Sequence, residues 1–196
     1  MADIKSAREI AMEKIESLGE VSEAERLRWK YVPIGEQMAA KYLKEGSNLL
    51  AELTQHEEKV RKYIVEGAAG ILSRYITLPK NEVAQRNNRK AMDGLKILKN
   101  DKAHVENVYS KIRYIFKHYA EEGQQQRDRA YQSLKNQFEA KVQQAMQQQA
   151  GMPARMRIDI ERQPQFQEEW RRLQSQLDLQ YLNHLNEYKR ELAKIA

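Results

Sequence analysis

Histidines and carboxylates are the side chains of this chain that could do metal chemistry, and their spacing does not favour it. The four histidines are His56, His104, His118 and His184, and none lies three or four residues from another. A di-iron site in a helical bundle needs Glu-x-x-His units on facing helices. The sequence contains none, and its nearest match, Asp101-x-x-His104, is better explained by a helix cap. We therefore expect no metal site.

Nucleophilic catalysis and cofactor binding have no better support. The chain has no cysteine, which excludes a thiol nucleophile, a zinc–thiolate site and a disulfide. No serine lies in a Gly-x-Ser-x-Gly elbow, and no glycine-rich loop resembles those that cradle phosphates. We expect no catalytic residues and no cofactor, and hence a protein that is not an enzyme.

The net charge of +6 is concentrated in residues 79–120, which hold ten Lys or Arg and four Asp or Glu. Its basic face at residues 80–102 could bind the phosphates of RNA, as in an RNA- or ribosome-associated factor, with an affinity that falls as salt rises. It could equally pack against acidic helices of the same molecule. Bases stack on exposed rings, whereas Tyr119 lies on an apolar stripe, so internal packing is favoured and nucleic acid stays the alternative. The residues of the alternative are Arg86, Arg89, Lys90, Lys96 and Lys99.

These side chains must be positioned by long helices. Only 8 Gly and 4 Pro occur in 196 residues, and 32% of the residues are charged. Few chain breakers among many strong helix formers predict an all-α protein, with an elongated helical bundle as its architecture. The apolar spacing and the breakers predict helices over about 3–18, 22–29, 36–77, 81–100, 102–149 and 164–195.

Local signals set those boundaries. Ser22 and Glu25 have the spacing of a capping box, and Pro33 with Gly35 should end the helix that follows. Asp101 should cap the helix that begins at 102, and Gly123 leaves open whether that helix runs straight to 149. Pro164 suits the first turn of the last helix.

Two small segments predict packing. The run Gly67-Ala68-Ala69-Gly70 is small on every side and predicts a close approach by another helix. The run 29–34 (WKYVPI) is densely apolar, and we expect it to lock the first two helices onto the longer ones, with a partner pocket as the lesser interpretation.

The last third of the chain predicts an antiparallel coiled-coil hairpin that protrudes from the bundle. An apolar stripe that begins with Phe166, Trp170 and Leu173 runs along the final helix, and Leu134 and Phe138 belong to a matching stripe before the turn. Two such stripes joined by a short connection bury each other. We therefore divide the chain into a helical body, residues 1–118, and a hairpin, residues 119–196.

The connection, residues 150–164, is called the tip. It combines apolar with basic side chains and either packs on the end of the hairpin or binds a partner. Our functional hypothesis is a non-enzymatic scaffold or adaptor that binds a protein through the tip, with self-association along the long helices left open. The tip residues concerned are Met152, Arg155, Met156, Arg157, Ile158 and Ile160.

Two segments near the start carry a resemblance to a known family. The runs 1–11 (MADIKSAREIA) and 28–33 (RWKYVP) resemble an uncharacterised bacterial family of small helical proteins, over about the first 45 residues. The resemblance implies a bacterial cytoplasmic protein and no functional residues. A cytoplasmic location also agrees with the lack of a signal peptide's apolar core and of an apolar run long enough to span a membrane.

Overall fold

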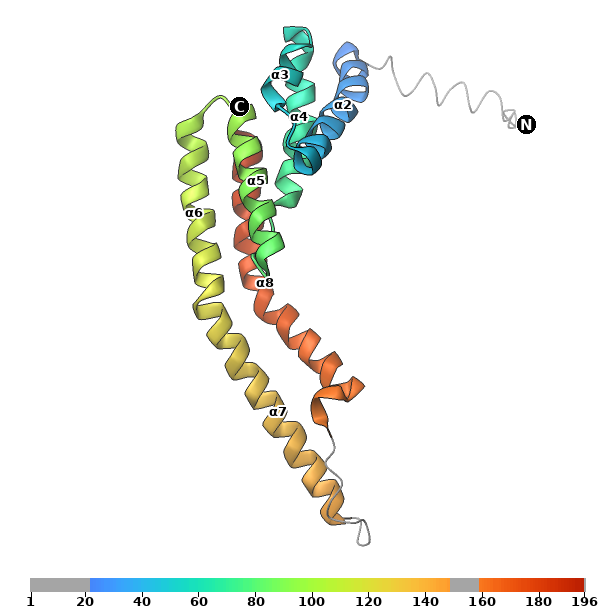
Figure 1. Cartoon of the computed structure of the whole chain (residues 1–196), viewed down its shortest axis with the longest axis vertical. Helices are drawn as coiled ribbons and strands as arrows, with labels where there is room; N and C mark the ends of the chain where they lie inside the picture. Colours follow the sequence, from blue (N-terminus) through green and yellow to red (C-terminus); the bar gives the residue numbers. More distant parts are fainter. Residues whose placement is uncertain (1–21, 149–158, 196) are drawn as a thin grey trace, which may run out of the picture. The chain divides into compact units, whose positions relative to one another are not determined.

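A computed structural model describes residues 22–148 and 159–195, and every regular element within them is helical (Figure 1). The all-α prediction is confirmed. The helix predicted over 3–18 lies outside the described residues, as do five of the predicted tip contacts: Met152, Arg155, Met156, Arg157 and Ile158.

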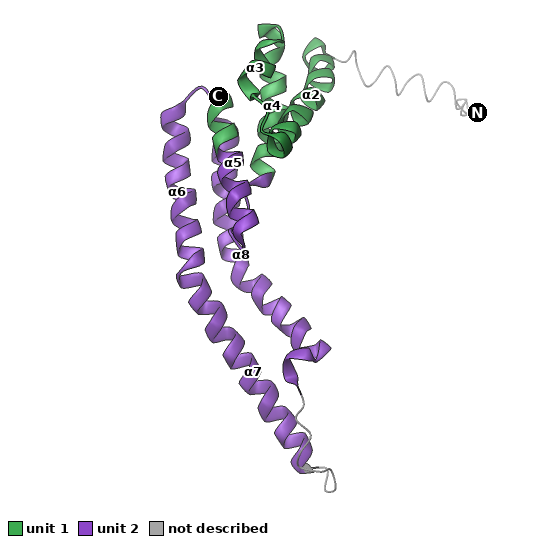
Figure 2. Ribbon diagram, in the orientation of Figure 1, with its two compact units in different colours: residues 1–74, 93–98 green, residues 75–92, 99–196 purple. Residues whose placement is uncertain are grey.

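The chain packs as two compact units (Figure 2). Unit 1 comprises residues 1–74 and 93–98, and unit 2 comprises residues 75–92 and 99–196. The division at residue 118 into a helical body and a helical hairpin stays a prediction.

Unit 1 contains α2 (Glu23–Glu45), α3 (Leu49–Thr54), α4 (Glu58–Tyr75) and the last turns of α5 (Glu82–Leu98). The predicted capping box is confirmed: the Glu25 amide donates to the Ser22 hydroxyl, and the Ser22 amide donates to the Glu25 carboxylate. Ala39, Ile64 and Leu72 form part of a fully buried core.

Helix α2 runs through Pro33, so the predicted end at Pro33 and Gly35 is wrong. A proline inside a helix costs about 3 kcal/mol. Close packing on α4 offsets this cost, because a Cβ atom on Gly35 would lie only 1.9 Å from the Ile64 carbonyl oxygen. A Cβ atom on Gly67 would lie 2.1 Å from the Val32 carbonyl oxygen. The close crossing predicted at Gly67 is therefore confirmed, and α2 is its partner.

The single helix predicted over 36–77 is also wrong. Gly46 ends α2 in the left-handed conformation, with φ of 76°, and its amide donates to the Tyr42 carbonyl. Asn48 then caps α3 by accepting from the Ala51 amide. The apolar spacing continues through these caps, so periodicity alone conceals the break. Trp29, predicted to lock helices together, is 67% exposed, and for this residue that prediction is wrong.

Unit 2 contains the first turns of α5, then α6 (Lys102–Ala120), α7 (Glu122–Gln148), the 3₁₀ turn η1 (Ile160–Arg162) and α8 (Pro164–Lys194). The predicted cap at Asp101 and the first-turn position of Pro164 are confirmed. The predicted helix 102–149 is interrupted at Glu121 rather than at Gly123. Gly123 has a different role, because a Cβ atom there would lie 3.1 Å from the Tyr181 hydroxyl.

Within unit 2, α8 packs against α6 and α7 and runs in the opposite direction (Figure 1). Rings that come later on α6 and α7 meet rings that come earlier on α8, with centroids 5.1 to 5.4 Å apart: Tyr119 with Tyr181, Tyr131 with Trp170, and Phe138 with Phe166. The apolar stripe predicted for the last helix faces inward, since none of its members is exposed: Phe166, Trp170, Leu173, Leu177, Tyr181, Leu185, Tyr188, Leu192 and Ile195.

Candidate functional site

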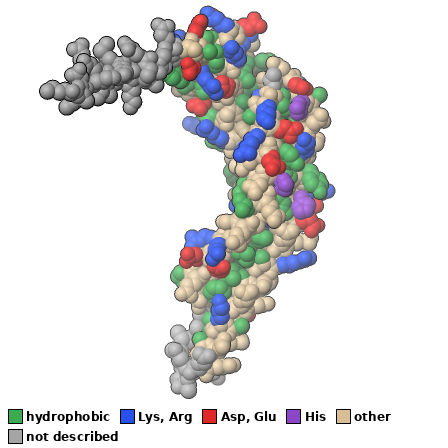
Figure 3. All heavy atoms as spheres, turned by 180° about the vertical axis from the view of Figure 1, so that it is seen from behind, with side chains coloured by type: hydrophobic (Ala, Val, Ile, Leu, Met, Phe, Trp, Pro, Cys, Tyr) green, Lys and Arg blue, Asp and Glu red, His purple; other side chains and the backbone are tan. Residues whose placement is uncertain are grey.

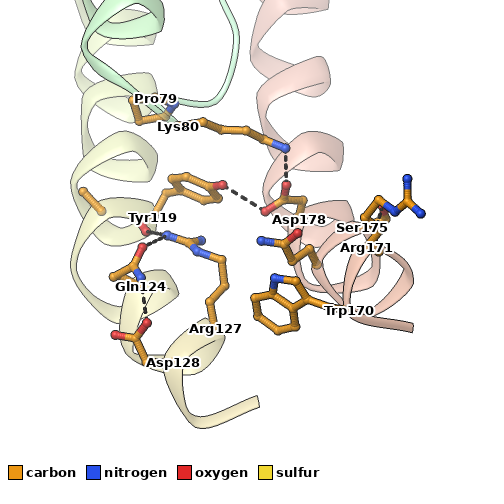
Figure 4. A pocket seen from close by; sticks show the side chains of 12 residues that line it. Pro79, Lys80, Tyr119, Gln124, Arg127, Asp128, Trp170, Arg171, Ser175 and Asp178 are labelled. Atoms are coloured by element: carbon orange, nitrogen blue, oxygen red, sulfur yellow. Dashed lines mark hydrogen bonds and ion pairs between the residues drawn. The ribbon is translucent and has the colours of Figure 1, made fainter. Parts of the chain in front are cut away.

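A hollow of about 620 Å³ lies in unit 2 between the α6–α7 junction and the middle of α8 (Figure 4). The segment with Pro79 and Lys80 borders it, and the α6–α7 junction and α8 supply its other sides. Its lining is polar and charged, with one indole: Tyr119, Ala120, Gln124, Arg127 and Asp128 on one side, and Trp170, Arg171, Gln174, Ser175 and Asp178 on the other.

Asp178 is a buried carboxylate, with 4% of its surface exposed. Its Oδ1 accepts a hydrogen bond from the Tyr119 hydroxyl at 3.0 Å, and its Oδ2 lies 2.5 Å from the Lys80 ammonium (Figure 4). A carboxylate is buried at tolerable cost only when such partners replace water. Sequence reasoning missed Asp178, although one signal was available. It stands at seven-residue spacing from Leu185 and Leu192, which are both buried.

Tyr119 links this carboxylate to the end of α6. It is 3% exposed, which confirms its predicted burial. Burial and the hydrogen bond to Asp178 raise the pKa of the Tyr119 phenol to about 12. The Tyr181 ring packs edge-on against it at 5.1 Å, and the Tyr181 hydroxyl lies 3.0 Å from His118 Nδ1. The phenol is therefore held in its neutral form as a hydrogen-bond donor.

Arg127 compensates for the break between α6 and α7. Its Nη2 donates to the Tyr119 carbonyl at 3.2 Å and to the Gln124 side chain at 2.9 Å. The guanidinium carbon lies 4.1 Å from the centroid of the Tyr119 ring. Helix ends leave carbonyls without a helical partner, and Arg127 satisfies one of them while it faces the hollow.

A second feature lies where α7 and α8 approach the tip. Leu134, Ile160 and Phe166 are buried together there, and Tyr131, Phe138, Val142 and Trp170 pack around them. The Lys135 ammonium lies 2.6 Å from the Glu161 carboxylate. Ile160, expected to contact a partner, is only 8% exposed and belongs to this cluster. That expectation is corrected, because the side chain packs against α7.

A second hollow lies beside this cluster. Its volume is about 420 Å³, and Leu134 and Phe138 border it among polar and charged side chains that include Lys141 and Arg172. On the face drawn in Figure 3, hydrophobic side chains reach the surface toward this end of α7 and α8. The surface at the end of the helix pair thus combines apolar with polar and charged side chains.

The basic residues of the alternative hypothesis do not form one exposed face. Arg86, Arg89 and Lys96 are exposed, and Lys90 is half-buried. Lys99 is only 7% exposed, and its ammonium donates to the Ile195 carbonyl. Burial lowers the pKa of Lys99. Lys99 is therefore a packing residue, and its assignment to a nucleic-acid surface is corrected.

The described residues contain neither a cluster of metal ligands nor a membrane-spanning helix. In residues 22–148 and 159–195, no three His, Asp or Glu side chains lie close enough together to hold a metal ion. None of the helices described has both the length and the apolar character that crossing a membrane requires.

Comparison with known proteins relates most of the chain to a protein family. The model of a protein family of unknown function, DUF6657, matches residues 50–194. The matched range includes the hollow around Asp178 and the cluster around Phe166. The expected relationship to a family without an assigned function is confirmed, over residues 50–194. No curated protein and no solved structure shows significant similarity to the chain.

Proposed function

The chain belongs to this family of unknown function, and we propose that it is a non-enzymatic helical scaffold or adaptor that binds a protein partner through the tip. In this proposal α7 and the facing part of α8 form a coiled-coil arm, and the tip is carried at its end. The observation that supports it best is the buried cluster of Leu134, Ile160 and Phe166 beside the tip.

That cluster anchors the C-terminal side of the tip. Ile160 follows the tip's central residues and packs against α7, and Phe166 holds the start of α8 on the same helix. A segment with one end already fixed loses less conformational freedom when it binds. The arm therefore reduces the conformational entropy that the tip would lose when it binds a partner.

The aromatic contacts support a stiff arm. Tyr131 packs edge-on against both Phe166 and Trp170, and Phe138 packs edge-on against Phe166. Edge-on aromatic pairs contribute about 0.5 to 1.5 kcal/mol each beyond the area they bury. Three such pairs in neighbouring turns resist separation of α7 from α8 at the end where the partner would pull.

The composition of the tip indicates the chemistry of the partner. Met156 and Ile158 are apolar, and Arg155 and Arg157 alternate with them. Methionine adapts to irregular apolar surfaces, and arginine pairs with carboxylates. We therefore expect a protein surface with an apolar pocket and an acidic border.

The chemistry of the hollow does not favour an enzyme. A general base works best when its pKa lies near the working pH. The Tyr119 phenol, with a pKa raised to about 12, keeps its proton at neutral pH. The neighbouring Asp178 carboxylate is engaged by Tyr119 and Lys80. These groups are suited to holding helices together.

An RNA- or ribosome-associated factor remains the second candidate, and the exposure of Arg86 and Arg89 supports it. These residues lie three apart on α5 and so share one side of the helix. The burial of Lys99 reduces the basic surface available to phosphate. The adaptor is therefore the first proposal.

One experiment separates the two. The tagged full chain is expressed in its native host as wild type, as M156S/I158S and as R86Q/R89Q, and the bound molecules are identified. The adaptor predicts a protein partner that wild type and R86Q/R89Q retain and M156S/I158S loses, with all three equally helical by circular dichroism. Bound RNA that falls with salt and disappears in R86Q/R89Q would support the second candidate instead.

A further inference from the structure

We propose that the hollow beside Arg127 binds a small organic anion in which a carboxylate or phosphate is attached to a flat ring. The proposal concerns the hollow between the α6–α7 junction and α8 and is independent of partner binding at the tip. Its volume, about 620 Å³, lies in the usual range for small-molecule sites, roughly 300 to 1,000 Å³.

Arg127 is the main reason to propose that the ligand carries a negative charge. The side chain is half-buried, and in the described part of the chain no Asp or Glu forms an ion pair with it. Its Nη2 is used by the Tyr119 carbonyl and Gln124. Its Nε and Nη1 donate no hydrogen bond within the described residues. A partly buried charge is costly without a counterion, and a bound carboxylate or phosphate would supply one.

The other charges of the hollow do not cancel this one. Lys80 and Asp178 form an ion pair with each other. Asp128 accepts a hydrogen bond from Gln124, and Arg171 adds a further cation to the lining. Three cations and two carboxylates thus line the hollow, so the balance is one positive charge in excess.

Trp170 is the reason to propose that the ligand also carries a flat ring. Its indole lines the hollow below Asp178 (Figure 4), and the Tyr131 ring packs against it edge-on with centroids 5.1 Å apart. Trp170 is half-buried, and its indole N–H has no hydrogen-bond partner among residues 22–148 and 159–195. An aromatic ring beside a guanidinium provides an apolar contact and a donor for one flat anion.

The fluorescence of Trp170 also provides a way to measure ligand binding. The chain has two tryptophans, Trp29 and Trp170, and Trp29 is exposed in unit 1. A W29F variant of the full chain therefore reports on the hollow alone. Phenyl phosphate and benzoate are titrated into it while its fluorescence is followed, with benzamide as the neutral ring and inorganic phosphate as the anion without a ring.

We expect a saturable change with phenyl phosphate or benzoate, and at least about ten-fold weaker binding of benzamide and of inorganic phosphate. In the W29F background, R127Q should weaken anion binding about ten-fold, the cost of one charge-assisted hydrogen bond, and R127K should recover part of it. R129Q is the matched control, because Arg129 is an exposed arginine that does not line the hollow, and it should bind as W29F does.

Arg127 also supports the α6–α7 junction, so R171Q provides a second variant. Arg171 is exposed, and within the described residues its guanidinium donates only to the Gln167 carbonyl of its own helix. R171Q should fold and should bind the anion about three-fold more weakly. The proposal is wrong if neither ring-bearing anion gives a saturable change, if benzamide binds equally well, or if R171Q and every folded Arg127 variant bind as W29F does. M156S/I158S should leave this binding unchanged.

Discussion

The Tyr119 hydroxyl at the end of α6 donates a 3.0 Å hydrogen bond to the buried Asp178 carboxylate in the middle of α8, 59 residues away in sequence. The same carboxylate receives the Lys80 ammonium. The hydrogen bond joins the end of α6 to α8, and the ion pair joins α8 to the segment that follows α4. The contribution of the Tyr119–Asp178 hydrogen bond to stability can be measured directly.

A double-mutant cycle should show that Tyr119 and Asp178 are coupled. Y119F leaves the Asp178 carboxylate without this donor, and D178L leaves the Tyr119 hydroxyl without an acceptor, and each change should cost roughly 1 to 3 kcal/mol. In the double variant the second loss is smaller, because the bond is already gone. We expect a coupling energy of about 1 kcal/mol or more from urea unfolding. Strictly additive effects would mean that the bond contributes nothing.

The pH dependence of stability should carry the signature of Tyr119. Its pKa is raised from 10.0 to about 12 on folding, so the folded state holds this proton more tightly than the unfolded state. The stabilisation is complete below pH 10 and is lost as the pH rises toward 12. Between these values the free energy of unfolding should fall more steeply for wild type than for Y119F. Parallel curves would show that the phenol titrates normally.

The close crossing of α2 and α4 predicts opposite effects for glycines in one helix. G67A places a Cβ atom 2.1 Å from the Val32 carbonyl oxygen. A backbone atom cannot move aside as a side chain can, so we expect destabilisation of about 3 kcal/mol or more. G70A meets nothing within 4 Å and should stabilise the helix by up to about 1 kcal/mol. Thermal unfolding of both variants checks this, and equal effects would contradict the crossing.

The cluster at the end of the arm should depend on Phe166. This side chain is buried against Tyr131 and Phe138, and F166A should cost about 3 to 5 kcal/mol. L179A alters an exposed leucine of the same helix and should change stability by less than about 0.5 kcal/mol. Hydrogen exchange should show the loss of protection in F166A near residues 131–138. Uniform loss along α8 would argue against a local cluster.

Local signals in the sequence predicted the helix ends that depend on local chemistry. Ser22 with Glu25, Asp101 and Pro164 act through hydrogen bonds or geometry within one turn, and each stands where the sequence indicated. The apolar stripe of α8 was predictable for the same reason, since burial follows the helical period.

The features that the sequence did not reveal depend on other helices. Pro33 remains inside α2 because Gly35 packs on the α4 backbone. The break at Glu121 is stabilised by Arg127, six residues further on, through the Tyr119 carbonyl. Asp178 is buried because Tyr119 and Lys80 reach it from distant segments. Helical periodicity does not reveal these contacts, because each of them joins different helices or segments.

The proposal that the tip binds a protein is tested most directly by cross-linking in the native host. A photoreactive residue replaces Met156 in the tip or, as the control, Gln132, which is exposed on the shaft of α7. We predict one host protein cross-linked in high yield from position 156 and not from position 132. No cross-link from position 156, or equal yields of the same product from both positions, would contradict the account.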